Sequence, residues 1–584
     1  MNRIKKYGSG LLITVLMLFT VSSCDLTELD INRDPNNPAQ ASLSLLLTNV
    51  ELNASSTFAG NLNDATHGFV AITDYFDSFN MTNSSWNGTW NYLYSNPLKD
   101  LDGILKTTAQ QRADGAANPY YEGIAKVLKA YYFSLMVDLW GDVPYSSAFQ
   151  GDAKTQNLAP AFDGGAAVYS DLLTLLDEAL AHFNETSPVN ISGDLIYGGS
   201  NTNIKNKWSR AARSLKFKLL LQMSRADASV IPTLTTMEAA NTTPGEEFIS
   251  SASDDFQFTF STTNNPDDRH PTYSDGYAGG TAAYSYYGHQ LMYEMLVPLT
   301  LGGTVPGDPR TYFYFKRQTS TVLNPDDPTD KNTMPCSQRT DCTYGYFPLS
   351  DYVAGGVYNK TAATLTNSQK TFLAGYFGRD RSDPSGIPND NPIRTTVGLY
   401  PAAGLYDDGP EAGGGNKGKG DGIFPMITTW MTKIHRIEAA LALGVATTTT
   451  PRTLFQTAMQ EQFAKVNSFV SKDPGAVAIS TARRDAYIND QLAKYDAAVS
   501  NTAKLNVVLK QAWFMNFGNG FEIYNTFRRT GMPTGLQTPL QPPRQFALRL
   551  PYAQDEINLN TNTPTVVFDS PANAVFWDVL KFQF

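Results

Sequence analysis

Charged residues, histidines and cysteines are all scarce in this chain of 584 residues. Lys, Arg, Asp and Glu make up only 17% of it, and the acids outnumber the bases to give a formal net charge of −10. Because no basic stripe is available to neutralise phosphates, the composition argues against nucleic acid binding. The five histidines form no HExxH or similar metal-binding spacing, and no G-x-S-x-G motif occurs. The sequence therefore predicts no metal site, no cofactor and no catalytic residues.

One glycine-rich segment imitates a catalytic motif. The stretch from Gly413 to Gly420 has the spacing of a phosphate-binding loop until its last residue, where Ser or Thr should hold magnesium. It also follows Pro410 and Glu411 instead of a buried strand, which favours a surface loop. Paired carboxylates for glycoside hydrolysis cannot be recognised from spacing, because their pairing is spatial. A helical glycoside hydrolase therefore stays an alternative.

Long hydrophobic runs are scarce too. The run from Leu11 to Phe19 follows a positively charged start and is too short to span a bilayer, but it fits the apolar region of a signal peptide. Val21-Ser-Ser-Cys24 then resembles a bacterial lipobox. We expect residues 1–23 to be removed and Cys24 to anchor the mature chain to a lipid bilayer through its acyl chains. A plain secretory signal with an incidental cysteine is the alternative.

Only two further cysteines, Cys336 and Cys342, remain in the chain. They are separated by five residues, and an exported protein meets an oxidising compartment, so we expect a local disulfide that fixes a surface loop. Two free thiols are the alternative. A metal site at this position lacks ligands, since no histidine is nearby.

Aromatic residues are abundant at 12%, and apolar residues recur at helical spacing through much of the chain. The clearest case begins at Tyr120, where a broad apolar stripe predicts a helix that ends at Gly141 and cannot resume beyond Pro144. Similar runs predict helices near residues 43–50, 98–105, 168–183 (with Asp163 as its cap), 208–223, 427–441, 455–470, 488–495 and 505–524.

Polar connections alternate with these runs, as expected for antiparallel helix pairs. Residues 227–424 lack this alternation of helices and connections. The segment is rich in Gly, Pro, Asn, Thr and Tyr, and its few apolar runs alternate with polar residues as in strands. We therefore predict a mainly α fold, a TPR-like scaffold of helical pairs (about 40–226 and 425–530) with a long loop-rich insertion that carries a few short strands. The mature chain, 24–584, is expected to be one domain.

Four motifs recur in order along the chain. The first is Asp138-Leu-Trp-Gly-Asp-Val-Pro-Tyr145, and the second is the helix start Lys207-Trp-Ser-Arg-Ala-Ala-Arg. The third combines Gln511-Ala-Trp-Phe with Phe527-Arg-Arg-Thr-Gly531, and the fourth is Arg549-Leu-Pro-Tyr552. Together, behind a lipobox, they resemble the SusD/RagB-type nutrient-binding lipoproteins of the bacterial outer membrane. The arginines and acids of these motifs are expected to form buried ion pairs that fix helix packing.

The resemblance implies a function in nutrient capture. It implies a lipid-anchored protein at the cell surface that binds an oligosaccharide or peptide and delivers it to a SusC-like TonB-dependent transporter, without breaking a bond. The partner follows from the family resemblance alone. The other alternative, besides the hydrolase, is a non-catalytic helical-repeat interaction scaffold, which would bind no small molecule.

Two stretches rich in aromatic and polar residues are the candidate binding sites. The first runs from Asp74 to Tyr94 and offers flat rings for stacking and amides for directional hydrogen bonds; its candidate residues are Tyr75, Asn80, Asn83, Trp86 and Trp90. We expect Trp86 to be exposed, whereas Trp90 is more consistent with the core. The second runs from Tyr273 to Tyr293, with Tyr284, Tyr286 and Tyr287 among glycines. Packing of these tyrosines within loops is the alternative for this second stretch.

Overall fold

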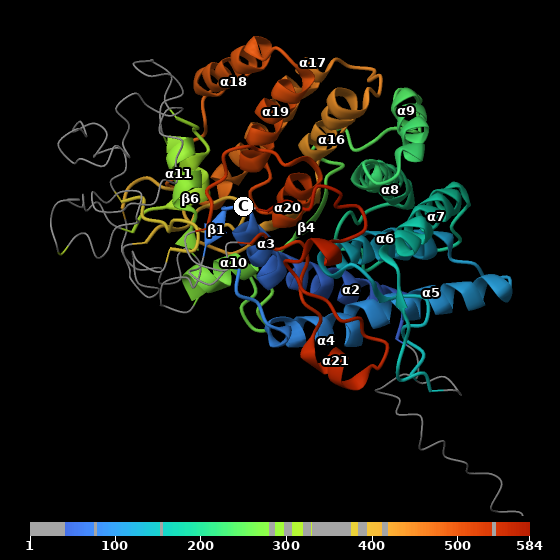
Figure 1. Cartoon of the computed structure of the whole chain (residues 1–584). Coiled ribbons are helices and arrows are strands. Elements are labelled where there is room, and N and C mark those ends of the chain that lie inside the picture. Colours follow the sequence, from blue (N-terminus) through green and yellow to red (C-terminus); the bar gives the residue numbers. More distant parts are fainter. Residues whose placement is uncertain are drawn as a thin grey trace, which may run out of the picture.

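The computed structural model describes residues 41–74, 79–151, 156–278, 286–296, 307–318, 329, 375–383, 394–410, 418–539 and 545–583. Within these ranges the chain is mainly helical, as predicted (Figure 1). The first group of helices is α2 (Leu43–Thr57), α3 (Asn63–Phe69), α4 (Asn87–Ser95), α5 (Pro97–Ala113), α6 (Pro119–Trp140), α7 (Gly165–Asn184), α8 (Asn201–Met223) and α9 (Ile231–Ala240). The second group is α16 (Thr429–Leu443), α17 (Pro451–Asn467), α18 (Thr481–Ala497), α19 (Asn501–Met515), α20 (Gly520–Thr530) and α21 (Gln554–Leu559).

Sequential helices pack as pairs. Helix α6 lies against α5, α7 and α8. In the second group, α16 and α18 each pack on both α17 and α19. In Figure 1 the helices α5 to α9 occupy the right side of the molecule and α16 to α19 lie at the top, whereas α21 lies at the bottom, below α4. The α9 helix falls inside the segment predicted as loop-rich, and it packs on α8 through Leu234. The TPR-like scaffold of helical pairs is therefore confirmed.

The central helix α6 is buried on all sides and not along a single stripe. Tyr131, Met136 and Trp140 are fully buried, and the helix ends at Gly141 as predicted, with a positive φ of 74°. The expected cap of α7 is wrong: Gly164 occupies that position, and Asp163 accepts hydrogen bonds from the backbone N–H groups of Tyr145 and Ser146. Asp163 therefore fixes the turn after α6 instead of starting α7.

Short strands form four two-stranded antiparallel sheets in the described part of the chain. They are β1 (Thr73–Asp74) with β5 (Tyr286–Tyr287), β2 (Val143–Pro144) with β3 (Phe162–Asp163), β4 (Phe256–Thr259) with β8 (Ile423–Ile427), and β6 (Phe315–Lys316) with β7 (Thr396–Val397). Four further short helices accompany them: α10 (Pro271–Tyr273), η4 (Ser274–Ala278), α11 (His289–Leu296) and α12 (Thr311–Tyr314). This loop-rich part adjoins the helices from the left in Figure 1.

Charged residues of the first and third sequence motifs meet in the core. Asp138 of α6 accepts hydrogen bonds from Asn525 at 2.6 Å and from the Trp577 indole at 2.8 Å. Arg528 of α20 donates to the carbonyl oxygens of Asp138 and Leu548, each at 2.7 Å. These contacts hold the C-terminal segment against α6, but they are hydrogen bonds to neutral groups and not the expected ion pairs. The neighbouring Arg529 does form a buried ion pair, with Glu438.

Candidate functional site

The two stretches selected from the sequence meet at one pair of strands. Thr73 pairs with Tyr287 and Asp74 pairs with Tyr286 in the antiparallel β1–β5 ladder. Some 200 residues of chain separate the two strands, so this juxtaposition is a result of the fold alone. The ladder brings the loop-rich insertion against α3, which belongs to the helical scaffold.

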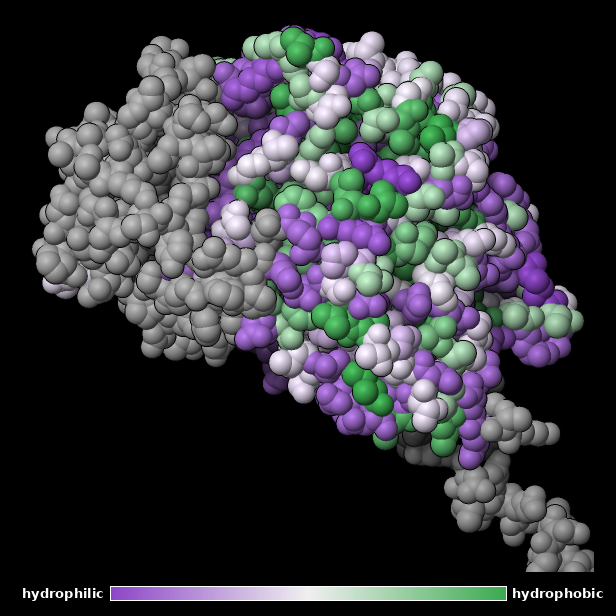
Figure 2. Space-filling model, in the orientation of Figure 1, coloured by the Kyte–Doolittle hydropathy of each residue, from purple (hydrophilic) through white to green (hydrophobic). Residues whose placement is uncertain are grey.

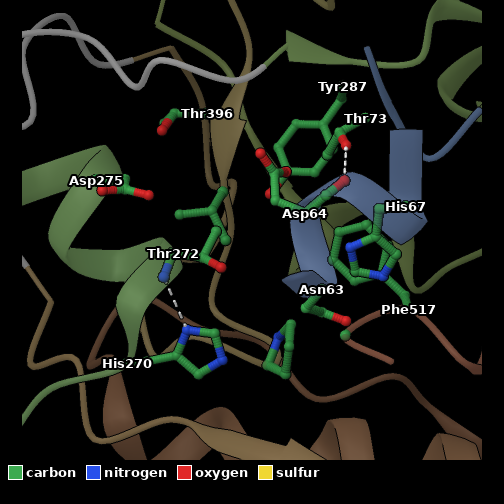
Figure 3. A pocket seen from close by; sticks show the side chains of 13 residues that line it. Asn63, Asp64, His67, Thr73, His270, Thr272, Asp275, Tyr287, Thr396 and Phe517 are labelled. Atoms are coloured by element: carbon green, nitrogen blue, oxygen red, sulfur yellow. Dashed lines mark hydrogen bonds between the residues drawn. The ribbon is translucent and has the colours of Figure 1, made fainter. Parts of the chain in front are cut away.

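A pocket lies beside this ladder, where the insertion meets the scaffold (Figure 3). It encloses about 40 Å³. Its walls come from α3, β1, α10, η4, β5, β7 and the turn before α20. The lining residues are Asn63, Asp64, His67, Thr73, His270, Thr272, Asp275, Tyr287, Thr396, Val397, Pro401, Phe517 and Gly518. Segments from distant parts of the chain therefore form one pocket, which is lined by both polar and apolar side chains.

A close approach between α3 and α20 fixes one wall. The backbone N–H of Gly520 donates to the Asn63 side chain at 2.7 Å. A Cβ atom at position 520 would lie 2.5 Å from the hydroxyl of Thr66, so only glycine lets the two helices come this near. This contact holds Asn63 and His67 of α3 opposite the turn that carries Phe517.

Several polar side chains of the pocket have no hydrogen-bond partner within the described residues. The buried Nε2 atom of His67 and the buried hydroxyl of Thr396 are unpaired there. His270 uses its Nδ1 to accept the backbone N–H of Thr272 at 3.2 Å, as the dashed line in Figure 3 shows. A buried polar group without a partner costs free energy. Such groups around a hollow therefore favour an occupant that can hydrogen-bond.

Burial sets the charge state of the pocket. Desolvation lowers the pKa of both His67 and His270 to about 3, and for His67 the proximity of His270 adds to the effect. Both rings are therefore neutral at physiological pH, each with one donor and one acceptor nitrogen. Desolvation, and then the neighbouring charge of Asp64, raises the pKa of Asp275, which lies at the solvent-exposed edge of the pocket.

The stretch around Trp86 packs against the C-terminal part of the chain. The expected exposure of Trp86 is wrong, because only 8% of the residue is accessible. Trp90 is buried, as the sequence indicated, and its indole donates to Glu556 at 3.2 Å. Asn83 donates to the Tyr552 carbonyl at 2.9 Å, whereas Asn80 is exposed. None of these four residues lines the pocket, and their role in ligand binding stays a prediction.

The tyrosines of the second stretch have different surroundings. Tyr287 lines the pocket. Tyr286 is buried, and the guanidinium groups of Arg379 and Arg394 lie 4.5 and 5.0 Å from its ring centre. Tyr75 and Tyr284 lie outside the described residues, as do Cys24 and the predicted disulfide partners Cys336 and Cys342.

Most residues of the pocket were not selected from the sequence. His67, His270, Thr396 and Phe517 stand in unrelated contexts, and no spacing connects them. Only Asp275 and Tyr287 fall within a selected stretch, that from Tyr273 to Tyr293. The single available signal was the enrichment of that stretch in tyrosine and glycine.

A second, more open hollow of about 460 Å³ lies between α5, α6 and α7. Tyr145 offers the aromatic ring there, but the ammonium group of Lys129 lies 4.3 Å from the centre of that ring and the edge of Phe133 packs on it. The face of this ring is therefore already in contact with Lys129, which leaves it less available for stacking on a ligand.

The described residues form neither a metal-binding cluster nor a membrane-spanning helix. No group of three or more His, Cys, Asp or Glu in these ranges is arranged to hold a metal ion. Among the described helices, none is long and apolar enough to cross a membrane.

Solved structures share this fold. The chain matches a SusD homologue from Bacteroides fragilis with a TM-score of 0.62 and 16% identity, over 92% of this chain and 99% of the other. It matches a chitin-binding SusD homologue from Flavobacterium johnsoniae with a TM-score of 0.56 and 16% identity, over 91% and 97%. A structure described as a chitin-binding protein gives 0.62 and 18%, over 92% and 100%.

Sequence comparison defines the family. No curated protein sequence matches the chain. Residues 35–328, about half of the chain, match the model of the SusD-like family, whose description is starch-binding associating with outer membrane. The chain therefore belongs to the SusD-like family, as its four motifs suggested.

Proposed function

We propose that this protein binds an oligosaccharide at the cell surface and delivers it to a SusC-like TonB-dependent transporter. The observation that carries the proposal is the family match, since the family description joins starch binding with the outer membrane. In this proposal the protein captures and releases its ligand without breaking a bond. The affinity is expected to be modest, because release into the transporter must follow capture.

The pocket at the β1–β5 ladder supports a glycan as the ligand. It combines hydrogen-bonding side chains with the apolar walls of Val397, Pro401 and Phe517, so it suits a sugar substituent that carries both polar and apolar atoms. Two structural neighbours are described as chitin-binding, and this also favours a glycan. A peptide remains the alternative ligand.

Membrane attachment is the second part of the proposal. Residues 1–23 would be removed as a lipoprotein signal peptide, and the mature chain 24–584 would form one domain held to the outer membrane by acyl chains on Cys24. The motif Val21-Ser-Ser-Cys24 supports this assignment.

Calorimetric titration of residues 25–584 with a panel of oligosaccharides and peptides tests the ligand class. We expect saturable heats with at least one oligosaccharide series and none with peptides. Binding to peptides only, or to no member of the panel, would contradict the proposal. Chromatography of the same oligosaccharides after long incubation should show no shortened products, whereas their appearance would favour the glycoside hydrolase.

The transporter partner needs a separate experiment. Full-length protein with an affinity tag should retain a TonB-dependent barrel when it is purified from detergent-solubilised membranes of its own cells. Recovery of the tagged protein without any barrel would contradict this part of the proposal and would leave the ligand-binding result untouched.

A further inference from the structure

We propose that the pocket at the β1–β5 ladder receives the acetamido group of an N-acetylated sugar, an inference that rests on the glycan-binding function proposed above. The sugar ring itself would lie outside the pocket, at the edge marked by Asp275. Size, hydrogen-bonding capacity, apolar lining and charge each support this choice of occupant.

The size of the pocket excludes a whole sugar ring. Its volume of about 40 Å³ corresponds to roughly three water molecules, since each needs about 10–15 Å³ on this measure. A pendant group of a few non-hydrogen atoms fits this space. The substituents of common hexoses that combine this size with both a donor and an acceptor include the acetamido group, whose N–H donates and whose carbonyl oxygen accepts.

The unpaired side chains of the pocket can satisfy both ends of an amide. The neutral ring of His67 makes no hydrogen bond within the described residues, and the hydroxyl groups of Tyr287 and Thr272 make none there either. These groups can donate to the carbonyl oxygen of the amide. The carboxylate of Asp275 at the edge can accept its N–H. Figure 3 shows these side chains arranged around the hollow.

The apolar part of the lining suits the methyl group of the amide. Val397, Pro401 and the ring of Phe517 form this part of the wall. A hydroxyl or hydroxymethyl group would leave these surfaces without a matching apolar partner. Burial of the methyl group against them is favourable and adds to the hydrogen bonds of the amide.

The charges around the pocket argue against ionised substituents. No Lys or Arg is among the lining residues, and Asp64 and Asp275 would repel a carboxylate or a sulfate. An ammonium group has donors only, so it could pair with Asp275 but would leave the hydroxyl groups and the apolar wall unmatched. A neutral amide offers an acceptor to the hydroxyl groups, a donor to Asp275 and a methyl group to the apolar wall.

Matched oligosaccharides isolate the contribution of the acetamido group. Chitotetraose, cellotetraose and the fully deacetylated glucosamine tetramer share one β-1,4-linked backbone and differ at carbon 2. Calorimetric titration should give an affinity for chitotetraose at least about tenfold higher than for either of the other two, as expected for a few well-placed contacts in one pocket.

A pocket-filling variant locates the effect. The side chain of Thr272 lines the pocket and makes no hydrogen bond within the described residues, so Thr272→Leu should fill the space with little harm to the fold. We expect it to lower the affinity for chitotetraose about tenfold, to the level of cellotetraose. Thr233→Leu, on the exposed surface of α9 far from the pocket, is the matched control and should change neither affinity (Figure 1). Circular dichroism and melting curves verify folding, and Tyr287→Phe provides a second variant that removes only a hydroxyl group.

The outcomes separate this inference from the function on which it rests. If no oligosaccharide in the wider panel binds, the proposed function fails. If chitotetraose and cellotetraose bind equally, or the glucosamine tetramer binds best, the function stands and the acetamido assignment fails. The assignment also fails if the preference for chitotetraose survives in folded Thr272→Leu and Tyr287→Phe.

Discussion

At the scale of single residues, Glu51 illustrates how burial changes a carboxyl group. It is fully buried on α2, accepts the backbone N–H of Leu195 at 2.6 Å, and lies beside Asp194. Desolvation, and then the charge of Asp194, raises the pKa of Glu51 well above its ordinary value. Protonated Glu51 therefore fits the folded state better than ionised Glu51.

The pH dependence of stability follows from this pKa. Because the folded-state pKa of Glu51 is raised, its contribution to stability is fully present below the unfolded-state value, about 4.5, and is lost as the pH rises through the folded pKa. Glu51→Gln keeps an acceptor for Leu195 and a donor toward Asp194 but carries no charge. We expect this variant to be more stable than the wild type at pH 8 and equal to it at pH 4, as measured by urea unfolding. An equal difference at both pH values would contradict the assignment.

The ion pair between Arg529 and Glu438 gives a second prediction. It joins α20 to α16 through two contacts of 2.6 and 2.8 Å, and both side chains are 2% exposed. Glu438→Ala would leave the guanidinium group buried without its counter-ion, so we expect a loss of about 3–5 kcal/mol in the free energy of unfolding.

An exposed pair of the same geometry is the control. Arg452 contacts Asp496 at 2.7 and 2.8 Å, and both side chains are 47% exposed. Asp496→Ala should change the free energy of unfolding very little, because solvent and salt screen this pair. Similar losses in Glu438→Ala and Asp496→Ala would show that burial is not the deciding factor.

At the scale of helices, Gly123 reports how closely α6 and α7 pack, and Gly103 of α5 is its control. A Cβ atom at Gly123 of α6 would lie 2.8 Å from the ring of Phe183 of α7, which is fully buried. A Cβ atom at Gly103 of α5 would meet nothing closer than 3.9 Å. Both positions are helical, so alanine improves the intrinsic helix propensity equally at each.

Opposite effects are therefore expected from the same substitution. Gly103→Ala should stabilise the protein by about 0.5–1 kcal/mol. Gly123→Ala should destabilise it, because overpacking costs about 1–3 kcal/mol and exceeds the gain in propensity. Thermal unfolding of the two variants measures the difference. A stabilising Gly123→Ala would mean that α6 and α7 can separate without cost.

At the scale of the whole molecule, attachment to the membrane is the testable property. If Cys24 is acylated, radiolabelled palmitate should be incorporated into the wild type, and the protein should sediment with membranes. Cys24→Ala should abolish labelling and release the protein into the soluble fraction, while binding of oligosaccharides by the purified protein stays unchanged. Labelling of Cys24→Ala, or a soluble wild-type protein, would contradict the lipoprotein assignment.

The positions of most helices could be predicted from the sequence. Helices α2, α5, α6, α7, α8, α16, α17 and α18 lie where apolar spacing placed them. The predicted helix 505–524 is divided into α19 and α20, because the turn at residues 516–519 interrupts it and Asn519 caps α20. Apolar spacing continues through this turn, because Phe517 is also buried. The spacing of apolar residues therefore did not indicate that the helix ends here.

The candidate site was predictable only in part. Tyr287 and Asp275 were within a selected stretch, whereas Trp86 was expected at the surface and is buried. The error arose because the polar residues around Trp86 suggested solvent, while the chain from Tyr552 to Glu556, far away in the sequence, covers this region. The residues next to Trp86 in the sequence do not indicate that the segment 552–556 covers it.

The sequence by itself determined the helical class, the family and the buried role of the motif arginines, because periodicity and short motifs are local properties that a single stretch can carry. Only the tertiary structure decided which polar residues face one another. His67, Asp275, Thr396 and Phe517 come from four separate segments, and they share one pocket because the β1–β5 ladder and the α3–α20 contact bring those segments together. Such long-range contacts depend on the packing of the whole core, which no local pattern encodes.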